Sequence, residues 1–238
     1  MSNNLILSNL SVFYRNKSVI DKINLEIPLH QWVVIAGNNG SGKTSLFKAI
    51  TGKISYSGEI HVVNEKSKHE VNVTPHYFSY LEQNTPFQVP FTVSELVVMG
   101  TYHKKPRFSH YTKEDYSLAE EFISLFEITH LKHKIFSELS GGEQILVWLA
   151  QILLMDSEII LLDEPTRHLD TYYTNLVLGI FYRLVEEKKK SIILITHDLN
   201  SLKGYKGRLI NLSSKPVVLE ELNEGSIARN MEKLKEKG

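Results

Sequence analysis

The sequence predicts an α/β fold built on a mainly parallel sheet with helices on both faces. Residues 32–36, 158–162 and 191–196 are largely apolar runs without alternation, which is typical of strands buried on both faces. Stretches with helical spacing of apolar residues separate these runs, as parallel connections require. The first run leads into a glycine-rich turn at 37–44 and then into an apolar-striped helix at 45–50. Ligands of such sheets are expected at the carboxyl ends of the strands.

Composition narrows the class of protein. The 238 residues can form one substantial domain. Basic and acidic side chains number 27 each, so no overall field favours nucleic acid or an anionic membrane. There is no cysteine, which fits a reducing compartment. No apolar run approaches the ~18–20 residues that span a bilayer, and the first residues lack a secretion signal. We therefore expect a soluble, cytoplasmic protein that does not bind nucleic acid.

The chain before and just after the glycine-rich turn is rich in strand signals. Residues 5–14 and 19–27 are rich in Val, Ile and Leu and are parted by a short polar turn, so they predict two antiparallel strands. Residues 52–58 predict a turn, and 59–63 and 76–81 predict two further strands.

The middle of the chain is predicted to be helical. Thr92 and Glu95 have the spacing of a capping box, which predicts a helix through Val98. Thr112 opens a second predicted helix by the same logic. We therefore place a small helical subdomain at 86–139.

Helices and strands alternate again in the last part of the chain. A helix is predicted at about 140–151, and Asp170 caps another that ends in the lysines of 188–190. An amphipathic helix is expected at the end of the chain. The predicted division is a core of residues 1–85 and 140–222 with its antiparallel β subdomain, a helical subdomain of 86–139, and a C-terminal helix of 223–238.

The glycine-rich turn predicts a phosphate-binding loop. Its three glycines let the backbone curl, so that successive N–H groups and the positive end of the next helix point at one anion. Lys43 can reach the outer phosphates, and the Thr44 hydroxyl can ligate the accompanying Mg²⁺. The alternative is a plain surface turn, but the position between a strand and a helix favours nucleotide binding. The predicted nucleotide-binding residues here are Gly37, Asn38, Asn39, Gly40, Ser41, Gly42, Lys43 and Thr44.

Two further motifs carry charge or anion-binding geometry. Asp163 and Glu164 end an apolar strand, where Asp163 suits Mg²⁺ held through its water shell and Glu164 suits polarising an attacking water. The alternative is a strand end followed by a turn.

Residues 139–143 form a second glycine-rich turn that opens a helix and can grip another anion. One nucleotide has no need of both turns within one molecule, unless the second turn serves a nucleotide held by a partner.

The order and spacing of these motifs resemble the nucleotide-binding domain of ATP-binding cassette proteins, from about residue 5 to residue 212. The resemblance implies a P-loop NTPase fold that binds ATP and Mg²⁺. Residues 37–44 match Walker A, Gln83 the Q-loop, 139–143 the signature, 159–164 Walker B, 168–170 the D-loop and His197 the switch histidine.

By this resemblance, Tyr14 would stack on adenine, and Gln83 would approach the metal and the attacking water while reporting on a transmembrane partner. His197 would contact the γ-phosphate. For single residues the alternatives are a rim position for Tyr14 and a capping or packing role for Gln83 or His197. The implied catalytic residues are Lys43, Gln83, Glu164 and His197, the metal ligands are Thr44, Gln83 and Asp163, and the further nucleotide contacts are Tyr14, Ser140, Gly141, Gly142 and Asp170.

The chain departs from the family pattern at three places. His30 and Gln31 stand in the turn where the family usually has a glycine. Ile145 and Leu146 replace a common Gln-Arg pair after the signature, and Gln151 stands where arginine is frequent. We expect these changes to alter the packing of the signature helix or its partner surface rather than the catalytic groups.

The resemblance implies an ATPase that works as a head-to-tail dimer with a second copy of itself or a homologous ATPase subunit. It would drive a separate transmembrane permease at the inner face of the membrane and touch the membrane only through that permease. Residues 91–100 and 111–115 resemble importers of iron chelates, haem or cobalamin. Alternatives are importers of the zinc and manganese type, other ABC transporters, or a soluble ABC ATPase without transport, although the last usually carries two cassettes in one chain.

Overall fold

A computed structural model describes most of the chain. The described residues are 3–15, 17–64, 70–72, 77–83, 90–106 and 109–235. His76 and Pro86, where a strand and the helical subdomain were predicted to begin, lie outside the described residues, as do the last three residues of the predicted C-terminal helix.

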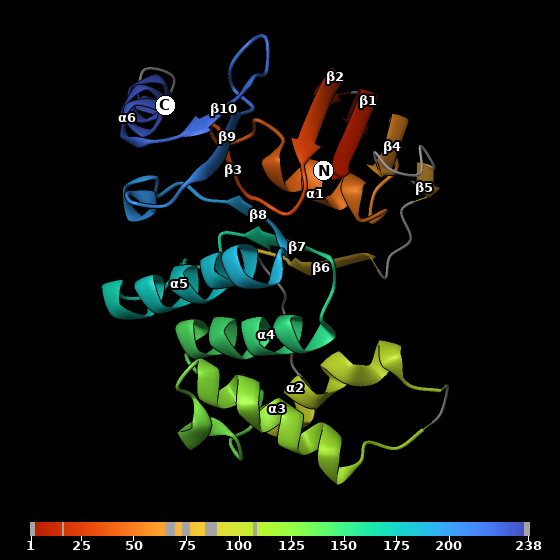
Figure 1. Ribbon diagram of the computed structural model, residues 1–238, viewed down its shortest axis with the longest axis vertical. Helices are drawn as coiled ribbons and strands as arrows, with labels where there is room; N and C mark the ends of the chain where they lie inside the picture. The colour runs from red at the N-terminus through yellow and green to blue at the C-terminus, as the bar shows by residue number, and fades with distance from the viewer. Residues whose placement is uncertain are drawn as a thin grey trace.

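A six-stranded sheet forms the centre of the molecule, with strand order β10-β9-β3-β8-β7-β6 (Figure 1). All neighbouring pairs are parallel except β10 with β9. The predicted mainly parallel sheet is therefore confirmed, whereas β9 and β10 were not predicted. The strands are β3 (Trp32–Ala36), β6 (Phe78–Leu81), β7 (Ile159–Asp163), β8 (Ser191–Ile195), β9 (Gly207–Asn211) and β10 (Leu219–Leu222).

A second, antiparallel sheet has the order β2-β1-β4-β5. The predicted pair of N-terminal strands is confirmed, and both strands are slightly longer than expected. Tyr14, the last residue of β1, pairs with Lys17 across the turn to β2. The strands are β1 (Asn3–Tyr14), β2 (Lys17–Pro28), β4 (Ser57–Asn64) and β5 (Glu70–Asn72).

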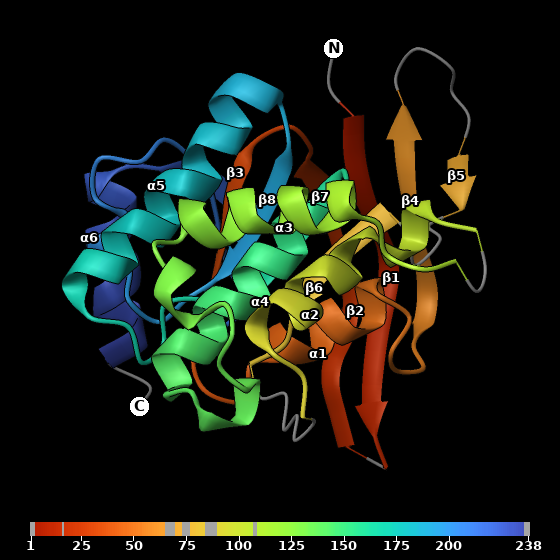
Figure 2. The same cartoon turned by 90° about the horizontal axis from the view of Figure 1, so that it is seen from below.

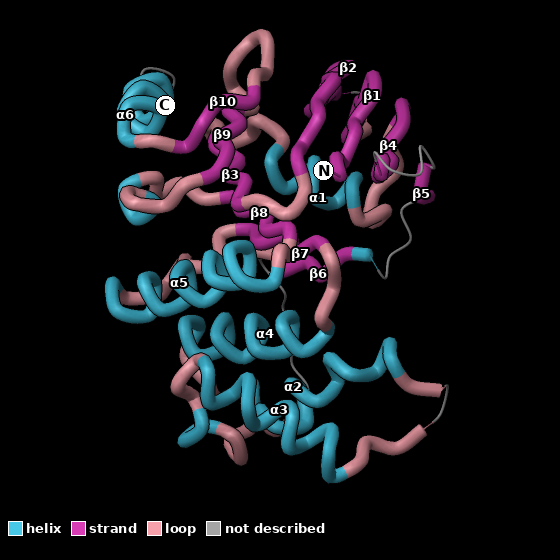
Figure 3. The backbone as a smooth tube through the Cα atoms, in the orientation of Figure 1, coloured by secondary structure: helices cyan, strands magenta, loops and turns pink. Residues whose placement is uncertain are grey.

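The helices cover both faces of the central sheet. In Figures 1 and 3, α1 lies between the two sheets, α4 and α5 lie on the opposite face, and α2 and α3 lie beyond α4. Figure 2, which views the molecule from below, shows α2 and α3 in front of α4. The helices are α1 (Lys43–Ile50), α2 (Val93–Val98), α3 (Lys113–Leu125), α4 (Gly141–Met155), α5 (Thr171–Lys188) and α6 (Glu224–Lys235), with short 3₁₀ helices at Met99–Lys104, Thr129–Leu131, Phe136–Glu138 and Asn200–Leu202.

Four predicted helix starts are confirmed by their caps. Thr92 and Thr112 each accept a hydrogen bond from the N–H three residues on, within complete capping boxes. Ser140 does the same for α4, and Asp170 accepts from the Tyr173 N–H at the start of α5. These side chains satisfy N–H groups that a helix start leaves without partners.

The central sheet separates two hydrophobic cores. In β3, Trp32, Val34 and Ala36 belong to the core shared with α2 to α5. Val33 and Ile35 belong to the core shared with α1 and the antiparallel sheet. Because alternate residues enter different cores, both faces of the strand are apolar, which explains the continuous apolar runs in the sequence.

Candidate functional site

Two positions of the loop between β3 and α1 have a backbone conformation and surroundings that only glycine fits. Gly42 precedes α1 with φ +94°, and a Cβ added there would lie 2.8 Å from Ile20 Cγ1. A Cβ added to Gly37 would lie 2.5 Å from Ser41 Oγ. The loop is therefore tightly curled against β2, as a cradle for an anion requires.

The polar groups of this loop fit an anionic ligand. Lys43 is buried, and its Nζ donates hydrogen bonds to the carbonyl oxygens of Gly37 (2.7 Å) and Asn38 (3.1 Å). Burial lowers the pKa of Lys43, and the nearby charge of Glu164 opposes that shift. Among the described residues, Asn38 Oδ1 and Ser41 Oγ are buried without a hydrogen-bond partner. The Ser41 hydroxyl can donate to a phosphate oxygen, whereas the Asn38 amide oxygen can only accept a hydrogen bond. A buried cation beside an unpartnered hydroxyl is an environment that nucleotide phosphates would complete.

Two oxygen donors suited to Mg²⁺ meet at the start of α1. The Thr44 hydroxyl donates to Asp163 Oδ2 at 2.7 Å, which joins α1 to the end of β7. Burial raises the pKa of Asp163, and the hydrogen bond from Thr44 opposes this shift. Hydroxyl and carboxylate oxygens are the ligands that Mg²⁺ prefers, so this pair fits the metal.

Glu164 and His197 face one another at the ends of neighbouring strands. Glu164 follows β7 with φ +56°, and its N–H donates to the Ile195 carbonyl at the end of β8 (3.0 Å). Its Oε1 lies 3.2 Å from His197 Nε2. Burial raises the pKa of Glu164 to about 7, and burial lowers the pKa of His197. A carboxyl group with a pKa near neutrality is suited to accept a proton at neutral pH.

Some of the predicted site residues line two neighbouring clefts, whereas Lys43, Thr44 and His197 line neither of them. Gln83, Asp163 and Glu164 line a cleft of about 430 Å³, to which Gly141 also contributes from the start of α4. A second cleft, of about 340 Å³, is lined by residues of the signature turn and of the segment before α5. From the predicted site these are Ser140, Gly142 and Asp170. Within one chain, therefore, Ser140 and Gly142 open onto a different cleft from Asp163 and Glu164.

The signature turn is fixed by its own helix cap and by a close backbone contact. Ser140 Oγ and the Ser140 N–H both donate to Glu143 Oε2 at 2.7 Å. A Cβ added to Gly142 would lie 2.9 Å from the His168 carbonyl oxygen, so α4 packs directly on the segment before α5. The signature turn and that segment consequently form one surface.

Tyr14 lies at the exposed end of β1. Its side chain is 47% exposed, and Phe13 beside it is 54% exposed. An exposed ring face can stack on a base. The adenine contact of Tyr14 stays a prediction.

Two residues of the site were missed from the sequence. Glu82, just before Gln83, pairs with Lys48 (2.7 Å) and Lys53 (3.0 Å) and so ties the end of β6 to α1 and the turn after it. Tyr80 packs edge-on against Phe47 of α1, with ring centroids 5.7 Å apart. Burial and the nearby charge of Asp163 raise the pKa of the Tyr80 hydroxyl. A charged residue directly after an apolar strand was the available signal for Glu82.

The departures after the signature act through packing. Leu146 is buried, and Ile145 lines the larger cleft together with Trp148. Gln151 Nε2 donates to the Leu96 carbonyl oxygen at 2.6 Å, which joins α4 to α2. Among the described residues, no hydrogen bond or ion pair joins Ile145, Leu146 or Gln151 to Lys43, Asp163 or Glu164, although Ile145 lines the same cleft as the two carboxylates.

Within the described residues, we find no helix that combines the length and apolar character needed to cross a membrane.

Comparisons with known proteins agree with this geometry. A family profile described as ABC transporter matches residues 20–167. The manganese transport system ATP-binding protein of Halalkalibacterium halodurans is 30% identical over 211 residues, which are 88% of this chain and 82% of the relative. The ferric enterobactin transport ATP-binding protein of Escherichia coli is 31% identical over 218 residues, which are 89% of this chain and 79% of the relative.

A dimeric bacterial ABC transporter cassette of solved structure superposes with a TM-score of 0.77 and 24% identity, covering 92% of this chain and 98% of the cassette. This likeness shows the P-loop NTPase fold of the cassette. The profile match and the curated relatives show the family. The chain therefore belongs to the ABC transporter family, as an ATP-hydrolysing subunit that uses ATP and Mg²⁺.

Proposed function

We propose that the site around the phosphate loop hydrolyses ATP with the following division of labour. The loop N–H groups and Lys43 bind the phosphates, and Thr44 and Asp163 hold Mg²⁺ with help from Gln83. Bound Mg²⁺ supplies charge neutralisation at the phosphates. The observation that carries the proposal is the Thr44–Asp163 hydrogen bond of 2.7 Å directly beside Glu164, because it brings together metal ligands and a proton acceptor.

Glu164 is the proposed general base in this scheme. It takes a proton from the attacking water, and His197, 3.2 Å away, orients its carboxylate and contacts the γ-phosphate. The raised pKa of Glu164, a result of burial, supports proton transfer at neutral pH.

The complete site is proposed to form between two ATPase subunits. Ser140, Gly141 and Gly142 would grip the γ-phosphate of a nucleotide held by the second subunit, and Asp170 would lie at the same interface. Ser140 and Gly142 line a different cleft from Asp163 and Glu164, which supports this arrangement, as does the dimeric state of the related cassette.

The helical subdomain is the proposed docking surface for the transmembrane permease. Tyr102 and Phe91 are exposed aromatic residues of this part of the chain, which favours a partner there. Gly100 approaches α4 so closely that an added Cβ would lie 2.6 Å from the Gln151 carbonyl oxygen. A displacement of this surface by the permease would therefore be transmitted to α4, whose first turn carries the signature.

The transported substrate is proposed to be an iron chelate, haem or cobalamin, taken up through that permease at the inner face of the membrane. The relative named for ferric enterobactin transport supports this class. The relative named for manganese transport keeps a metal-ion importer as the second candidate.

Uptake measurements test the substrate class. In the source cell, the gene is deleted and complemented with the wild type, with Lys43→Ala, or with Lys17→Ala as an exposed control lysine. We expect deletion to abolish uptake of radiolabelled iron chelate, haem or cobalamin while radiomanganese uptake continues. The wild type and Lys17→Ala should restore uptake, and Lys43→Ala should not. Loss of manganese uptake alone would assign the chain to the second class, and unchanged uptake of all four would overturn the import proposal.

A further inference from the structure

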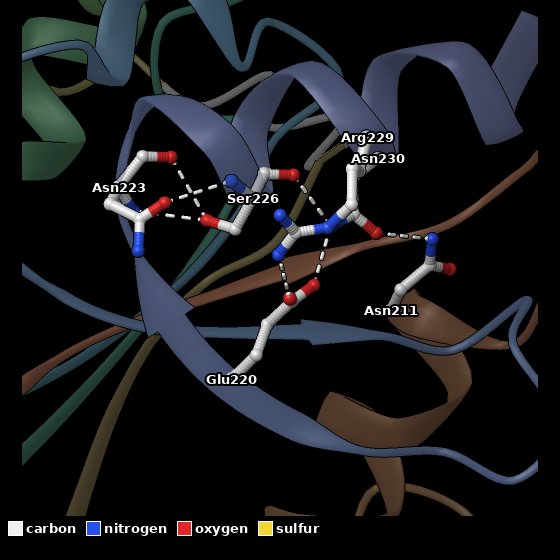
Figure 4. A network of polar contacts seen from close by, with 6 residues as sticks. All are labelled: Asn211, Glu220, Asn223, Ser226, Arg229 and Asn230. Carbon is white, nitrogen blue, oxygen red and sulfur yellow. Dashed lines mark hydrogen bonds and ion pairs between the residues drawn. The ribbon is translucent and has the colours of Figure 1, made fainter.

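Helix α6 is joined to the end of β9 by buried side-chain amides (Figure 4). Asn230 of α6 is 1% exposed, and its Nδ2 donates to Glu220 Oε1 (2.7 Å) and to the Ser226 carbonyl oxygen (2.8 Å). Its Oδ1 accepts from Asn211 Nδ2 at 2.7 Å. Asn211 is the last residue of β9 and is also buried.

The hydrogen bonds continue from Asn211 into the phosphate loop. Asn211 Oδ1 accepts from the Ser213 N–H at 2.8 Å, and Ser213 Oγ accepts from the Asn38 N–H at 2.8 Å. The Leu212 N–H donates to the Ala36 carbonyl oxygen at 2.9 Å, which fixes this segment beside the end of β3. A chain of hydrogen bonds thus runs from Glu220 through Asn230, Asn211 and Ser213 to Asn38; we name it the α6 relay.

The hydrogen-bond partners determine which way the side-chain amides of Asn230 and Asn211 are oriented in the α6 relay. Asn230 uses both N–H donors on Glu220 and Ser226, so it can only accept from Asn211. Asn211 must therefore present its nitrogen to Asn230 and its oxygen to Ser213. Reversing or removing one amide would leave buried polar groups without partners, which is more costly than losing one exposed hydrogen bond.

Ser213 and Lys43 bind the same residue of the phosphate loop, Asn38, through different backbone groups. The Asn38 N–H is bound by Ser213, whereas the Asn38 carbonyl oxygen accepts from Lys43 Nζ. Ser213 Oγ also lies 3.3 Å from the position of a Cβ on Gly37, so it packs against the turn. The Lys43 ammonium has three N–H donors, of which the carbonyl oxygens of Gly37 and Asn38 use two, so one remains for a phosphate. Ser213 occupies the Asn38 N–H and leaves the N–H groups at the start of α1 to the ligand. A loop that is already ordered loses less conformational entropy on binding.

We propose that Ser213, Asn211 and Asn230 are positioning residues, through which helix α6 holds the phosphate loop in its nucleotide-binding conformation and raises the affinity for ATP. The inference rests on ATP binding at the loop. It does not depend on which substrate the permease carries.

The first experiment compares Ser213→Ala with Ser213→Thr, which keeps the hydroxyl, and with the neighbouring control Ser214→Ala. Two quantities are measured on the purified chain: the dissociation constant of ATP, and amide hydrogen exchange of residues 37–42 without nucleotide. For Ser213→Ala we expect ATP to bind roughly tenfold more weakly, as the loss of one hydrogen bond predicts, and loop amides to exchange faster. Ser213→Thr should lie near the wild type, and Ser214→Ala should not change either quantity.

The second experiment tests the remote end of the relay. Asn230→Ala should weaken ATP binding several-fold and speed exchange in the loop. Arg229→Ala removes the neighbouring 2.8 Å ion pair to the same Glu220 and should leave both quantities unchanged. Because one chain of bonds is involved, the double variant Asn230→Ala with Ser213→Ala should bind ATP about as well as Ser213→Ala alone.

Several results would overturn the proposal. A lower unfolding temperature of Asn230→Ala with unchanged loop exchange and ATP affinity would make the relay purely structural, and fully additive effects in the double variant would make the two residues independent. If Asn230→Ala does not fold, equal behaviour of Ser213→Ala and Ser213→Thr overturns the proposal by itself. Absence of ATP binding by the wild type would instead contradict the assignment of the loop.

Discussion

At the scale of single residues, the contacts of Glu164 differ from those of Thr44 and Asp163, the proposed metal ligands. Asp163 is engaged by Thr44, whereas the Glu164 carboxylate lies beside His197. The two adjacent carboxylates therefore have different surroundings, which suits one for metal binding and the other for proton transfer.

Glu164→Gln tests this division. Glutamine keeps the shape of the side chain but cannot take a proton, so turnover should fall by roughly 10²–10⁴. ATP affinity should change little, because Lys43, Thr44 and Asp163 are intact. Phosphate release and an ATP titration measure the two effects, and Asp163→Asn serves as a comparison that should also weaken the dependence of binding on Mg²⁺. Near-normal turnover of Glu164→Gln would remove Glu164 from the role of base.

His30 shows how the fold accommodates a departure from the family pattern. It has φ +57°, a left-handed conformation that glycine adopts most readily, in the turn where the family usually has glycine. Hydrogen bonds of His30 offset the strain of this conformation. The His30 ring bonds to the Lys189 carbonyl oxygen (2.5 Å) and to Asn3 (3.2 Å), and the backbone N–H of His30 donates to Ser191 Oγ. The sequence shows the substitution, but these long-range partners are visible only in the fold.

At the scale of elements, Ser140 caps the start of α4 and is also proposed to bind a phosphate, and these two roles compete for its hydroxyl. Ser140 donates its hydroxyl proton to Glu143 here, although the same hydroxyl is proposed to contact a phosphate. Hydrogen bonds from the Ser140 hydroxyl and N–H lower the pKa of Glu143 from its ordinary value of 4.5. Because the folded value is the lower one, this contribution to stability is present above pH 4.5 and is lost as the pH falls through the folded pKa.

Glu143→Gln isolates the charge of this cap. At neutral pH the variant should unfold about 0.5–1 kcal/mol more easily than the wild type, since a carboxylate at a helix start is favourable. The difference should shrink as the pH falls below 4.5. Thermal unfolding without nucleotide, followed by circular dichroism from pH 7 to pH 3, measures it. Glu121→Gln, at an exposed position of α3, is the control, and a difference that stays constant with pH would contradict the ionised cap.

The elements that could be predicted from sequence are those with local signals. The caps at Thr92, Thr112 and Asp170 depend on side chains within a few residues, and α4 was underestimated only at its end, where Asp156 terminates it with φ +57°. Strands β9 and β10 were missed because both are short. Strand β9 pairs with β3, which is far away in sequence, and β10 joins the sheet only through β9. For the same reason Ser213 could not be connected to Asn38.

At the scale of the whole molecule, the two turns that are predicted to bind anions lead into helices on different faces of the central sheet. Helix α1, which follows the phosphate loop, packs in the core with the antiparallel sheet. Helix α4, which follows the signature turn, packs in the other core, and Figure 1 shows the two helices on opposite faces. This packing on opposite faces favours the proposal that the two turns of one chain serve different nucleotides, and that a second copy in a head-to-tail arrangement presents its signature turn to the first chain's loop.

Trapping ATP tests this assembly. If Ser140 and Gly142 grip a nucleotide held by the partner, blocked hydrolysis should leave ATP clamped between two subunits, so Glu164→Gln with Mg-ATP should elute as a dimer. Adding Ser140→Arg crowds the signature turn and gives it a positive charge, which should return the protein to a monomer. As a control, Ser124→Arg adds the same charge at an exposed position of α3 and should leave the dimer intact. Light scattering with and without ATP measures the mass. Circular dichroism checks that Ser140→Arg, which also removes a cap worth about 1 kcal/mol, remains folded. An ATP-bound monomer of Glu164→Gln with hydrolysis blocked would preserve the proposed chemistry and contradict the shared site.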